Sequence, residues 1–529
     1  VQTCALPISH RFASMVYPFV DANNQLRSAW IERVSPTAAA GILGVTYSNI
    51  SGTTTGTYTD GATTLDTKAN DTWAVSAIQG TPTAATSFKI QMQAPGIFGG
   101  ALLNASTRVL KATSNTFVGT HEAGTTTPGG HRITLTAADL TAEPFSLAIN
   151  AVDIPFASVA TGDWNVATTW NKGTVPTCSD PVTIASGHTV TVNSAANVAK
   201  NLTINSGATL AVASGDLTVG CTLNNNPLTN NGTLTVSGGV LNINGNLMNN
   251  AGSTFNQSGG NINVDGSDGT TANSVATGTP LVRVTATAIS NLNLTGGTLT
   301  IVDPHYGTST SDYALSISQG GAYNSASANH TVKFGNGVST TAGGHANGFY
   351  VYLYPGSYYY GLGNVTVDAL TGTNRFVKTT STVSIAGNLT ITTGEYQLAS
   401  THYIAGNITN AGTLTSTSTL NLSGFNGSAS IPSTTAQTIS GSGVFQNLST
   451  ASTASLTSLT INNSNATGVT LSVPLSVSGT LTLTQGLINT SSTSLLTLGT
   501  ATAAGTLSGG SATAYVKGPF ARTIASANA

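Results

Sequence analysis

Side chains that could carry out chemistry are sparse in the larger part of the chain, from Phe156 to Thr513. The acids of this stretch are Asp163, Asp180, Asp216, Asp265, Asp268, Asp303, Asp312, Asp368 and Glu395. Asp265 and Asp268 lie close together in the segment VDGSDGT, where two carboxylates suit either a calcium-binding loop or a solvated turn. Asp303 with His305, and Arg283, are the remaining material for acid–base catalysis.

Enzymes that cleave polysaccharides need paired carboxylates at the sugar bond, or an acid cluster that binds calcium beside a basic residue. Stacking of the chain could bring Asp265, Asp303 and Arg283 together. So few acids and bases nevertheless favour a protein without a catalytic site, and no GxSxG motif accompanies its serines. A polysaccharide lyase, a hydrolase or a carbohydrate-binding module is the alternative. We expect no cofactor, apart from Ca²⁺ if Asp265 and Asp268 bind it.

The richest candidate for binding is the aromatic segment FYVYLYPGSYYYG. Its tyrosines are Tyr350, Tyr352, Tyr354, Tyr358, Tyr359 and Tyr360. The first three alternate, so they share one face of a strand, and the last three follow a Pro-Gly turn. An exposed tyrosine patch would bind a glycan or a protein surface, whereas a stack of rings would only support the fold.

Two tryptophans and two cysteines lie near the start of the same region. Trp164 and Trp170 either offer their faces to sugar rings or cap the end of a repeat structure, and capping is the preferred interpretation. Cys178 and Cys221 are expected to form one disulfide or to remain two buried thiols. Metal binding by these cysteines is not expected, because the groupings of a zinc site are missing. His188 is interpreted as structural.

These residues must be positioned by short strands, because the region reads as three- to five-residue apolar runs bounded by Gly, Asn or Ser. Leu202-Thr203-Ile204, Leu210-Ala211-Val212 and Leu217-Thr218-Val219 illustrate the pattern. Strands this short suit the sides of a coil in which each turn stacks on the previous one. We therefore predict a right-handed parallel β-helix over residues 154–513, with aliphatic side chains inside and small polar ones outside.

An Asn followed by an aliphatic residue gives the repeat length. It recurs at Asn201, Asn246, Asn291, Asn364, Asn388, Asn407 and Asn447. The gaps are near multiples of a rung of ~19–24 residues. A longer signature, GNLMNNAGSTF from Gly245, returns as GNITNAGTLTS from Gly406. Asparagine suits the corners of such a coil, because it tolerates left-handed backbone and its amide can bond to the equivalent amide above and below.

Residues 9–153 differ from this pattern and hold most of the glutamates. Alternating segments such as Phe88–Gln93 and Arg132–Thr136 predict half-buried antiparallel strands, and hence a β-sandwich domain. The opening VQTCALPI, residues 1–8, resembles the translation of a sequencing-adapter oligonucleotide, and we leave it out of the expected fold.

Composition supports an all-β protein and excludes several partners. The 16 Lys and Arg and 18 Asp and Glu residues make only 6% of the 529 positions, too few for the charged faces of surface helices. The net charge of −2 without a basic run argues against nucleic acid as a partner. No apolar stretch approaches the ~20 residues of a membrane span, so no membrane insertion is expected.

Three phrases near the C-terminus resemble a known family. AQTISGSGVFQNLST from Ala436, GTLTLTQGLINTSSTSLLTLG from Gly479 and GGSATAYVKGPFARTI from Gly509 are similar to repeats of large Bacteroidota surface proteins exported by type IX secretion. The resemblance covers most of Phe156 to Ile524. It implies a secreted, cell-surface or adhesin-like location, although the C-terminal sorting domain usual in that family is absent.

In that family a YVKGPFART-like phrase leads out of the β-helix into a β-rich module that opens with a YPFV-like phrase. Tyr17–Val20 and Tyr515–Thr523 match these phrases. The resemblance therefore implies the tail of one unit, a whole β-helix, and the start of a further module at 514–529. We expect a monomeric, elongated part of a larger extracellular chain that acts as a stalk, adhesin or scaffold with a glycan or cell-surface partner.

Overall fold

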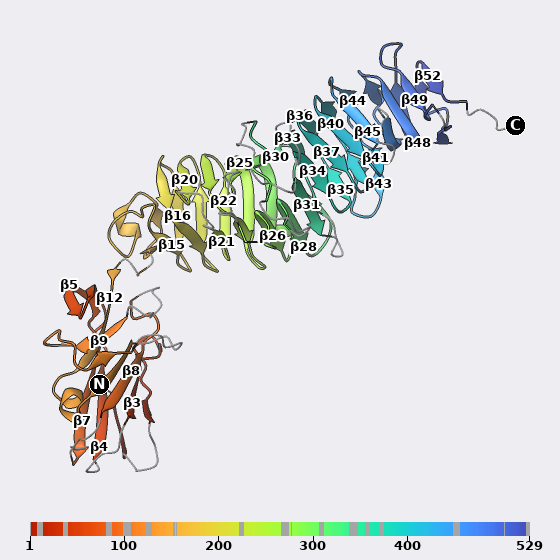
Figure 1. The fold of residues 1–529 in the computed structure, drawn as a ribbon. Coiled ribbons are helices and arrows are strands. Elements are labelled where there is room, and N and C mark those ends of the chain that lie inside the picture. Colours follow the sequence, from red (N-terminus) through yellow and green to blue (C-terminus); the bar gives the residue numbers. More distant parts are fainter. Residues whose placement is uncertain are drawn as a thin grey trace. The chain divides into compact units, whose positions relative to one another are not determined.

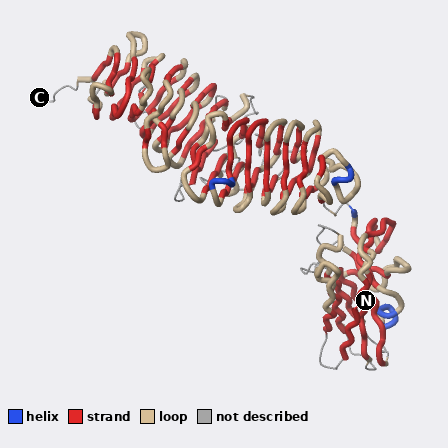
Figure 2. The backbone as a smooth tube through the Cα atoms, turned by 180° about the vertical axis from the view of Figure 1, so that it is seen from behind, coloured by secondary structure: helices blue, strands red, loops and turns tan. Residues whose placement is uncertain are grey.

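A computed structural model describes residues 2–7, 14–34, 41–80, 87–98, 107–122, 130–151, 154, 156–221, 227–265, 275–276, 278–305, 312–337, 348–354, 360–369, 375–447, 455–501 and 503–524. The chain divides into two compact units, Val1–Ala157 and Ser158–Ala529 (Figure 1). Both are built from strands (Figure 2), which confirms the predicted all-β class.

The first unit is a sandwich of two antiparallel sheets. In the described residues one sheet runs β1 (Gln2–Pro7), β4 (Ile42–Ser48), β7 (Thr72–Gln79), β12 (Phe145–Ile149), β6 (Thr63–Ala69) and β5 (Thr53–Asp60), with β9 (Arg108–Lys111) also paired to β12. The other runs β10 (Thr120–His121), β11 (Gly130–Leu135), β8 (Phe88–Gln93), β3 (Ser28–Arg33) and β2 (Ser14–Tyr17). A short helix, α1 (Ala137–Thr141), follows β11.

One apolar core joins the two sheets. Trp73 and Val45 come from the first sheet and Ile31 and Ile90 from the second, and all four are buried in the same cluster. Burial of this apolar surface is what holds two sheets face to face. Phe88–Gln93 alternates as expected, with Phe88, Ile90 and Met92 inward.

Two expectations for this unit differ from the structure. A bulge in β11 between Arg132 and Leu135 breaks the expected alternation, so Ile133 is half-buried while Arg132 is buried in an ion pair with Asp60. Residues 1–8 were left out of the fold, yet β1 pairs with β4 along its whole length. The edge of β4 is free to accept a strand there, and an extended segment satisfies its hydrogen bonds.

The second unit is a parallel β-helix. One of its parallel sheets contains, in the described residues, β15 (Pro181–Ile184), β18 (Asn201–Ile204), β21 (Leu228–Asn230), β24 (Leu247–Asn249), β26 (Val282–Ala286), β28 (Leu315–Gln319), β31 (Phe349–Tyr354), β34 (Phe376–Thr379), β37 (Glu395–Leu398), β40 (Thr413–Ser416) and β45 (Val444–Asn447).

The remaining faces join into a second, continuous sheet. Its described strands are β14 (Gly162–Asp163), β16 (Thr189–Val192), β17 (Asn197–Ala199), β19 (Thr209–Val212), β20 (Asp216–Val219), β22 (Thr233–Val236), β23 (Val240–Ile243), β25 (Thr254–Val264), β27 (Leu292–Ile301), β30 (His330–Phe334), β33 (Asn364–Asp368), β35 (Val383–Ile385), β36 (Leu389–Thr393), β38 (His402–Ile404), β39 (Ile408–Asn410), β41 (Thr419–Leu422), β44 (Gln437–Ser440), β46 (Ser455–Asn462), β47 (Val469–Leu471), β48 (Leu475–Asn489), β49 (Leu496–Leu498), β50 (Thr506–Gly509), β51 (Ala514–Lys517) and β52 (Phe520–Arg522).

Four short strands and two 3₁₀ turns complete the described elements of this unit. They are β29 (Asn324–Ser325) with β32 (Tyr360–Gly361), β42 (Gly424–Phe425) with β43 (Ser430–Ile431), η2 (Ala167–Thr169) and η3 (Ile289–Asn291). The pair β42–β43 is antiparallel, unlike the ladders around it.

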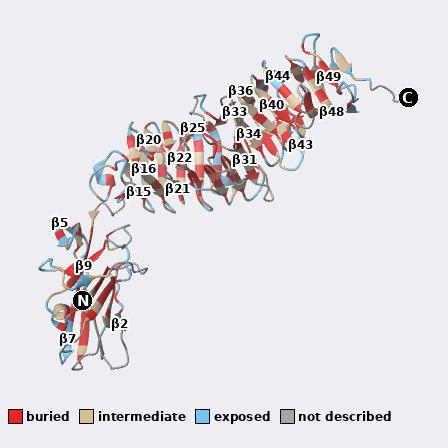
Figure 3. Cartoon of the chain, viewed as in Figure 1, coloured by how far each residue is buried: buried red, intermediate tan, exposed pale blue. Residues whose placement is uncertain are grey.

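Columns of aliphatic side chains fill the tube. Val190, Leu210, Leu234, Phe255 and Leu292 stand in register on successive rungs, and every one is buried. The intervening threonines face outward and are half-buried, which gives the alternating pattern of Figure 3. Each rung thus buries its apolar face on its neighbours while the backbone groups pair between rungs.

The number of residues per rung varies over a wider range than the predicted ~19–24. Hydrogen-bonded partners on neighbouring rungs are 19 residues apart at Asn230 and Asn249, and 24 apart at Asn364 and Asn388. Longer rungs occur in the middle of the coil, where the register pairs Leu247 with Val282, Val282 with Leu315 and Leu315 with Val351. The extra length includes segments that lie outside the described residues.

The recurring asparagines do not share one corner. Asn364, Asn388 and Asn407 stack, because the backbone N–H of each later residue donates to Oδ1 of the one before at 2.8 Å. Asn201 and Asn447 instead belong to β18 and β45 of the other sheet. The single period read from all seven was therefore wrong, since a rung has several corners with the same preference for asparagine.

A glycine corner explains the repeated Gly-Gly pairs. Gly239, Gly260 and Gly297 have φ values of 62°, 64° and 80°, and a Cβ on Gly260 would lie 2.4 Å from the carbonyl oxygen of Gly238 on the rung below. Only glycine fits both the left-handed backbone and this close approach.

The coil extends beyond its expected end. β51 and β52, which fall in the segment assigned to a further module, pair in parallel with β48 and β49. The predicted boundary at 513/514 therefore does not match the strand ladder, which continues to Arg522. Both strands are more exposed than those before them, with only Ala514 buried.

Candidate functional site

A polar groove of about 600 Å³ lies on the outer face of five rungs. Its floor is one in-register column, in which Thr218, Asn242, Asn263, Thr300 and Lys333 follow each other on β20, β23, β25, β27 and β30. The column lies outside the tube because the residues on either side of each member point inward. Five rungs of a parallel sheet extend about 19 Å from the first strand to the last.

The carboxamides of the groove have spare hydrogen-bonding capacity. Asn263 donates Nδ2–H to Oδ1 of Asn242 at 2.9 Å, and Asn244 donates Nδ2–H to the carbonyl of Gly220 at 2.6 Å. Within the described part of the chain, Nδ2 of Asn242 is left with unused donors, and Oδ1 of Asn263 and of Asn244 are left as unused acceptors. The groove therefore presents donors and acceptors side by side, one rung apart.

Charge in the groove is nearly balanced. Lys333 forms an ion pair of 2.8 Å with Asp368 on the next rung, and Asp265 lines the groove beside Asn263. A lysine that already has a carboxylate partner contributes little net attraction for an anion. The groove is thus suited to hydrogen bonding with hydroxyl groups.

A second surface feature is a strip of aromatic side chains on β31 and its neighbours. The rings of Tyr352 and Tyr313 are stacked with centroids 4.8 Å apart and planes 14° apart. Tyr350 meets Phe376 edge to face at 5.8 Å, and Nζ of Lys378 lies 5.8 Å from the Tyr350 ring. We call Tyr313, Tyr350 and Tyr352 the tyrosine strip. All three are half-buried on the outside of the coil, and burial raises the pKa of Tyr313.

The six predicted tyrosines do not form one patch. Tyr350 and Tyr352 share the outer face as expected, whereas Tyr360 lies in β32 with 2% of its surface exposed. Tyr360 was therefore wrongly placed in the exposed patch, because its side chain is buried where β32 pairs with β29. The side chain of Tyr354, and the whole of Tyr358 and Tyr359, lie outside the described residues.

The residues considered for catalysis have different partners. Arg283 donates from Nη2 to Oδ1 of Asn250 at 2.9 Å. The buried Asp303 faces Nη1 of Arg375 at 3.7 Å. Asp265 lines the polar groove.

The buried His305 follows Asp303 by two residues in the sequence. His305 Nδ1 lies 3.9 Å from Oδ1 of Asp312, which in turn accepts the backbone N–H of Gly278 at 2.6 Å. Burial lowers the pKa of His305, although the carboxylate of Asp312 opposes that shift. These contacts join the segments that contain Gly278, His305 and Asp312 beneath the surface.

The calcium hypothesis involves Asp265 and Asp268, and Asp268 lies outside the described residues. The described residues contain no group of three His, Cys, Asp or Glu side chains placed to hold a metal ion. Asp265 alone is therefore the part of the predicted loop site that can be located.

Trp164 and Trp170 are buried at the first rung, with 0% and 2% of their surfaces exposed. Their rings meet edge to face at 5.0 Å, and Trp170 donates Nε1–H to the carbonyl of Trp164 at 2.7 Å. Rings buried this way cover the end of the apolar tube and leave no face for a sugar. His188 lies nearby, with Nδ1 2.9 Å from Oγ of Ser158.

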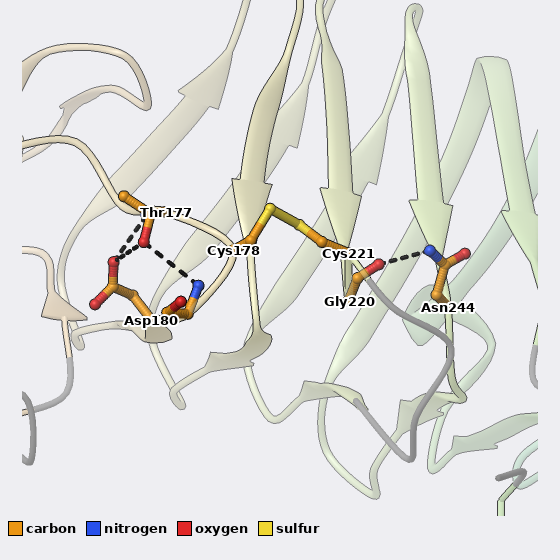
Figure 4. Close-up of a disulfide and its surroundings, with 7 residues drawn as sticks. Thr177, Cys178, Asp180, Gly220, Cys221 and Asn244 are labelled. Carbon is orange, nitrogen blue, oxygen red and sulfur yellow. Dashed lines mark hydrogen bonds between the residues drawn. A yellow bond between two sulfur atoms is a disulfide. The ribbon is translucent and has the colours of Figure 1, made fainter.

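Cys178 and Cys221 are joined by a disulfide (Figure 4). Cys178 lies in the turn before β15, where Thr177 donates its backbone N–H to Oδ2 of Asp180 at 2.9 Å. Cys221 directly follows Gly220, the residue whose carbonyl accepts from Asn244. The bond therefore ties the first rungs together next to one end of the polar groove.

Several surface residues were missed from the sequence. Tyr313 and Phe376 complete the aromatic contacts but stand alone in their own segments. Asn242 and Asn263 floor the groove, and the triplet Asn-Ile-Asn that contains each of them occurs twice, at 242–244 and 261–263. That repetition is the signal that points to the groove, because it places polar side chains outside on neighbouring rungs.

The chain was compared with protein-family models, curated proteins and solved structures. None of them matches. In the described residues, no helix has the length and apolar character needed to cross a bilayer.

Proposed function

We propose that this chain is a non-catalytic structural module of an extracellular, adhesin-like surface protein. In this proposal the β-helix acts as a stalk or scaffold, and its outer faces contact glycans or neighbouring cells. The tyrosine strip carries the proposal, because half-exposed stacked rings on a rigid sheet are suited to packing against a sugar ring or a protein surface.

The outer surface of the coil supports a scaffold role. Outward positions on its strands are mostly threonine, serine and asparagine, and the few charges include the pairs Lys333–Asp368 and Lys172–Asp180. Such a surface needs no charged partner to stay folded. It also gives many weak polar contacts along one axis, which is how an elongated adhesive surface gains strength.

An extracellular location is supported by two observations. A disulfide persists in oxidising compartments, and Cys178–Cys221 is one in this fold. The repeat phrases from Ala436, Gly479 and Gly509 are similar to those of Bacteroidota proteins exported by type IX secretion. We propose that route for the intact protein.

The carbohydrate-active enzyme is not our proposal. A lyase or hydrolase on this scaffold would use Asp265, Asp303 and Arg283 together. Asp303 and Arg283 instead engage Arg375 and Asn250, respectively.

The test is binding to a glycan array and to bacterial and epithelial cell surfaces. The full chain is compared with the double variant Tyr350→Ala/Tyr352→Ala and with Tyr403→Ala, which removes a stacked outward tyrosine from a different strand. Binding that falls about tenfold or more in the double variant alone supports the proposal. Binding that is absent, or equal in all three proteins, contradicts it, as does release of new sugar ends from any polysaccharide on the array.

A further inference from the structure

The polar groove and the tyrosine strip lie on different strands of the coil. The groove is floored by the column from Thr218 to Lys333 in the large sheet, whereas Tyr350 and Tyr352 belong to β31 of the other sheet. A ligand of the groove would therefore contact other residues than a ligand of the tyrosine strip.

We propose that the polar groove binds an extended, uncharged glycan that runs along the axis of the β-helix. Every rung presents one side chain of the column, about 4.8 Å from the next. A polymer with repeating hydroxyl groups can meet the half-buried Asn242 and Asn263 in succession, and Thr300, which is 8% exposed, lies below it on the next rung. The carboxamides of Asn242 and Asn263 are one donor–acceptor chain already held in place by their mutual hydrogen bond of 2.9 Å.

The spare atoms in the groove match hydroxyl groups. Asn242 offers Nδ2–H, and Asn263 and Asn244 offer Oδ1, and in the described residues these have no protein partner. A hydroxyl both donates and accepts, so one sugar ring can satisfy a donor and an acceptor on adjacent rungs. Binding costs the protein little conformational entropy, because the sheet fixes the backbone and the bond between the amides fixes their orientation.

Other classes of ligand fit less well. A peptide strand would need an unpaired sheet edge, but these strands are paired on both sides. Nucleic acid or an acidic polysaccharide would need basic side chains, and the lysine of the groove is paired with Asp368 while Asp265 adds a negative charge. An uncharged glycan remains as the chemistry that the groove recognises.

The inference rests on the proposed function only in taking a glycan as the partner, and its test separates the two. Titration calorimetry is carried out on the full chain with cellohexaose, maltohexaose, mannohexaose and a hyaluronan hexasaccharide. At least one neutral hexasaccharide is expected to bind, and the hyaluronan fragment is expected not to. Affinity for the neutral ligand should rise with chain length until the chain spans the five rungs.

The groove variant is Asn242→Ala/Asn263→Ala. Its matched control is Asn256→Ala/Asn293→Ala, which removes a similar amide pair, joined at 2.8 Å between neighbouring rungs, from outside the groove. The groove variant should weaken binding on the order of tenfold or more and the control should not. Circular dichroism and the melting temperature check that both variants are folded.

Three results overturn the groove proposal. These are the absence of binding by every neutral hexasaccharide, tighter binding of the hyaluronan fragment, and equal binding by the groove variant and its control. None of these results changes the outcome of the array and cell-binding test, which depends on Tyr350 and Tyr352. Failure of the groove and failure of the proposed function are therefore seen in different measurements.

Discussion

The side chain of Asn230 donates Nδ2–H to Oδ1 of Asn249 at 2.6 Å, one rung away and inside the coil. Both side chains are 0% exposed. Asn230 also donates to the carbonyl of Thr254 and accepts the backbone N–H of Gly232. Asn410 lies at a similar buried corner and donates to the carbonyl of Val444 at 2.9 Å. Inward asparagines at the end of short strands thus satisfy the backbone where it turns.

Replacing Asn230 with alanine should destabilise the β-helix by about 2 kcal/mol, because buried backbone groups at Gly232 and Thr254 lose their partner. The measurement is the midpoint of urea unfolding followed by circular dichroism. Asn231→Ala is the matched control, since Asn231 accepts from Asn250 at a half-buried position where water can replace the bond. Equal shifts of the two midpoints would show that the buried corner bonds have no special weight.

The position of the buried asparagines along the strands could be predicted in part from the sequence. The repeated phrases from Gly245 and Gly406 place Asn249 and Asn410 at equivalent points of a strand, and both asparagines are buried. That an asparagine would point into an apolar tube could not be read from the pattern, because its polarity predicts an outward position. The backbone groups that it satisfies become visible only once the rungs are stacked.

Two buried histidines should make the β-helix less stable in mild acid. Burial lowers the pKa of His330 and of His402 to about 4. His402 lies with Nδ1 2.7 Å from the carbonyl of Ser400, and Tyr396 places its hydroxyl 3.2 Å from Nε2. Nε2 of His330 lies 3.1 Å from Oε1 of Gln257. Both side chains are therefore neutral in the folded protein at pH 7.

The unfolded chain binds these protons near pH 6.5 and the folded chain near pH 4, so stability falls as the pH drops through that interval. Above pH 6.5 the contribution is constant. The loss approaches roughly 3 kcal/mol per histidine by pH 4. Urea midpoints between pH 7.5 and pH 4 measure it. The slope should be shallower in His402→Gln and unchanged in Asn231→Ala, and a slope in His402→Gln equal to that of the natural chain would refute the assignment.

The disulfide should stabilise the first rungs. It closes 43 residues, for which loop-closure entropy gives about 4 kcal/mol. In Cys178→Ser/Cys221→Ser, amide hydrogen exchange should speed up in β15 and β20 and stay unchanged in β46 and β48. Mass spectrometry of peptic fragments measures both regions in one experiment. Unchanged exchange near the serines would mean that strand stacking alone holds this end.

The pattern of short strands predicted the parallel coil and its outward threonines, but it did not show which asparagines share a corner. Thr189 and Thr209 stack one rung apart, within the predicted rung length of ~19–24 residues. The long rung from Leu315 to Val351 could not be foreseen, since an insertion leaves the next strand's own pattern intact.

The binding surfaces were harder to predict than the fold. Tyr350 and Tyr352 are neighbours in sequence and were found, but Tyr313 reaches Tyr352 from the rung below. The groove joins Asn242, Asn263 and Lys333 from rungs of unequal length. Side chains that meet only through stacking leave no local pattern, so their register has to be known first.

The central claim is that successive rungs lie in parallel register. Double electron–electron resonance tests it directly, because it measures the distance between two spin labels. Thr183 and Ser316 are half-buried outward residues separated by five strand steps, through Thr203, Thr229, Met248 and Arg283. Nitroxide labels on Thr183→Cys and Ser316→Cys, with Cys4→Ser in the background, should give a distance centred near 24 Å. A broad distribution, or a centre twice as far, would contradict the stacked coil.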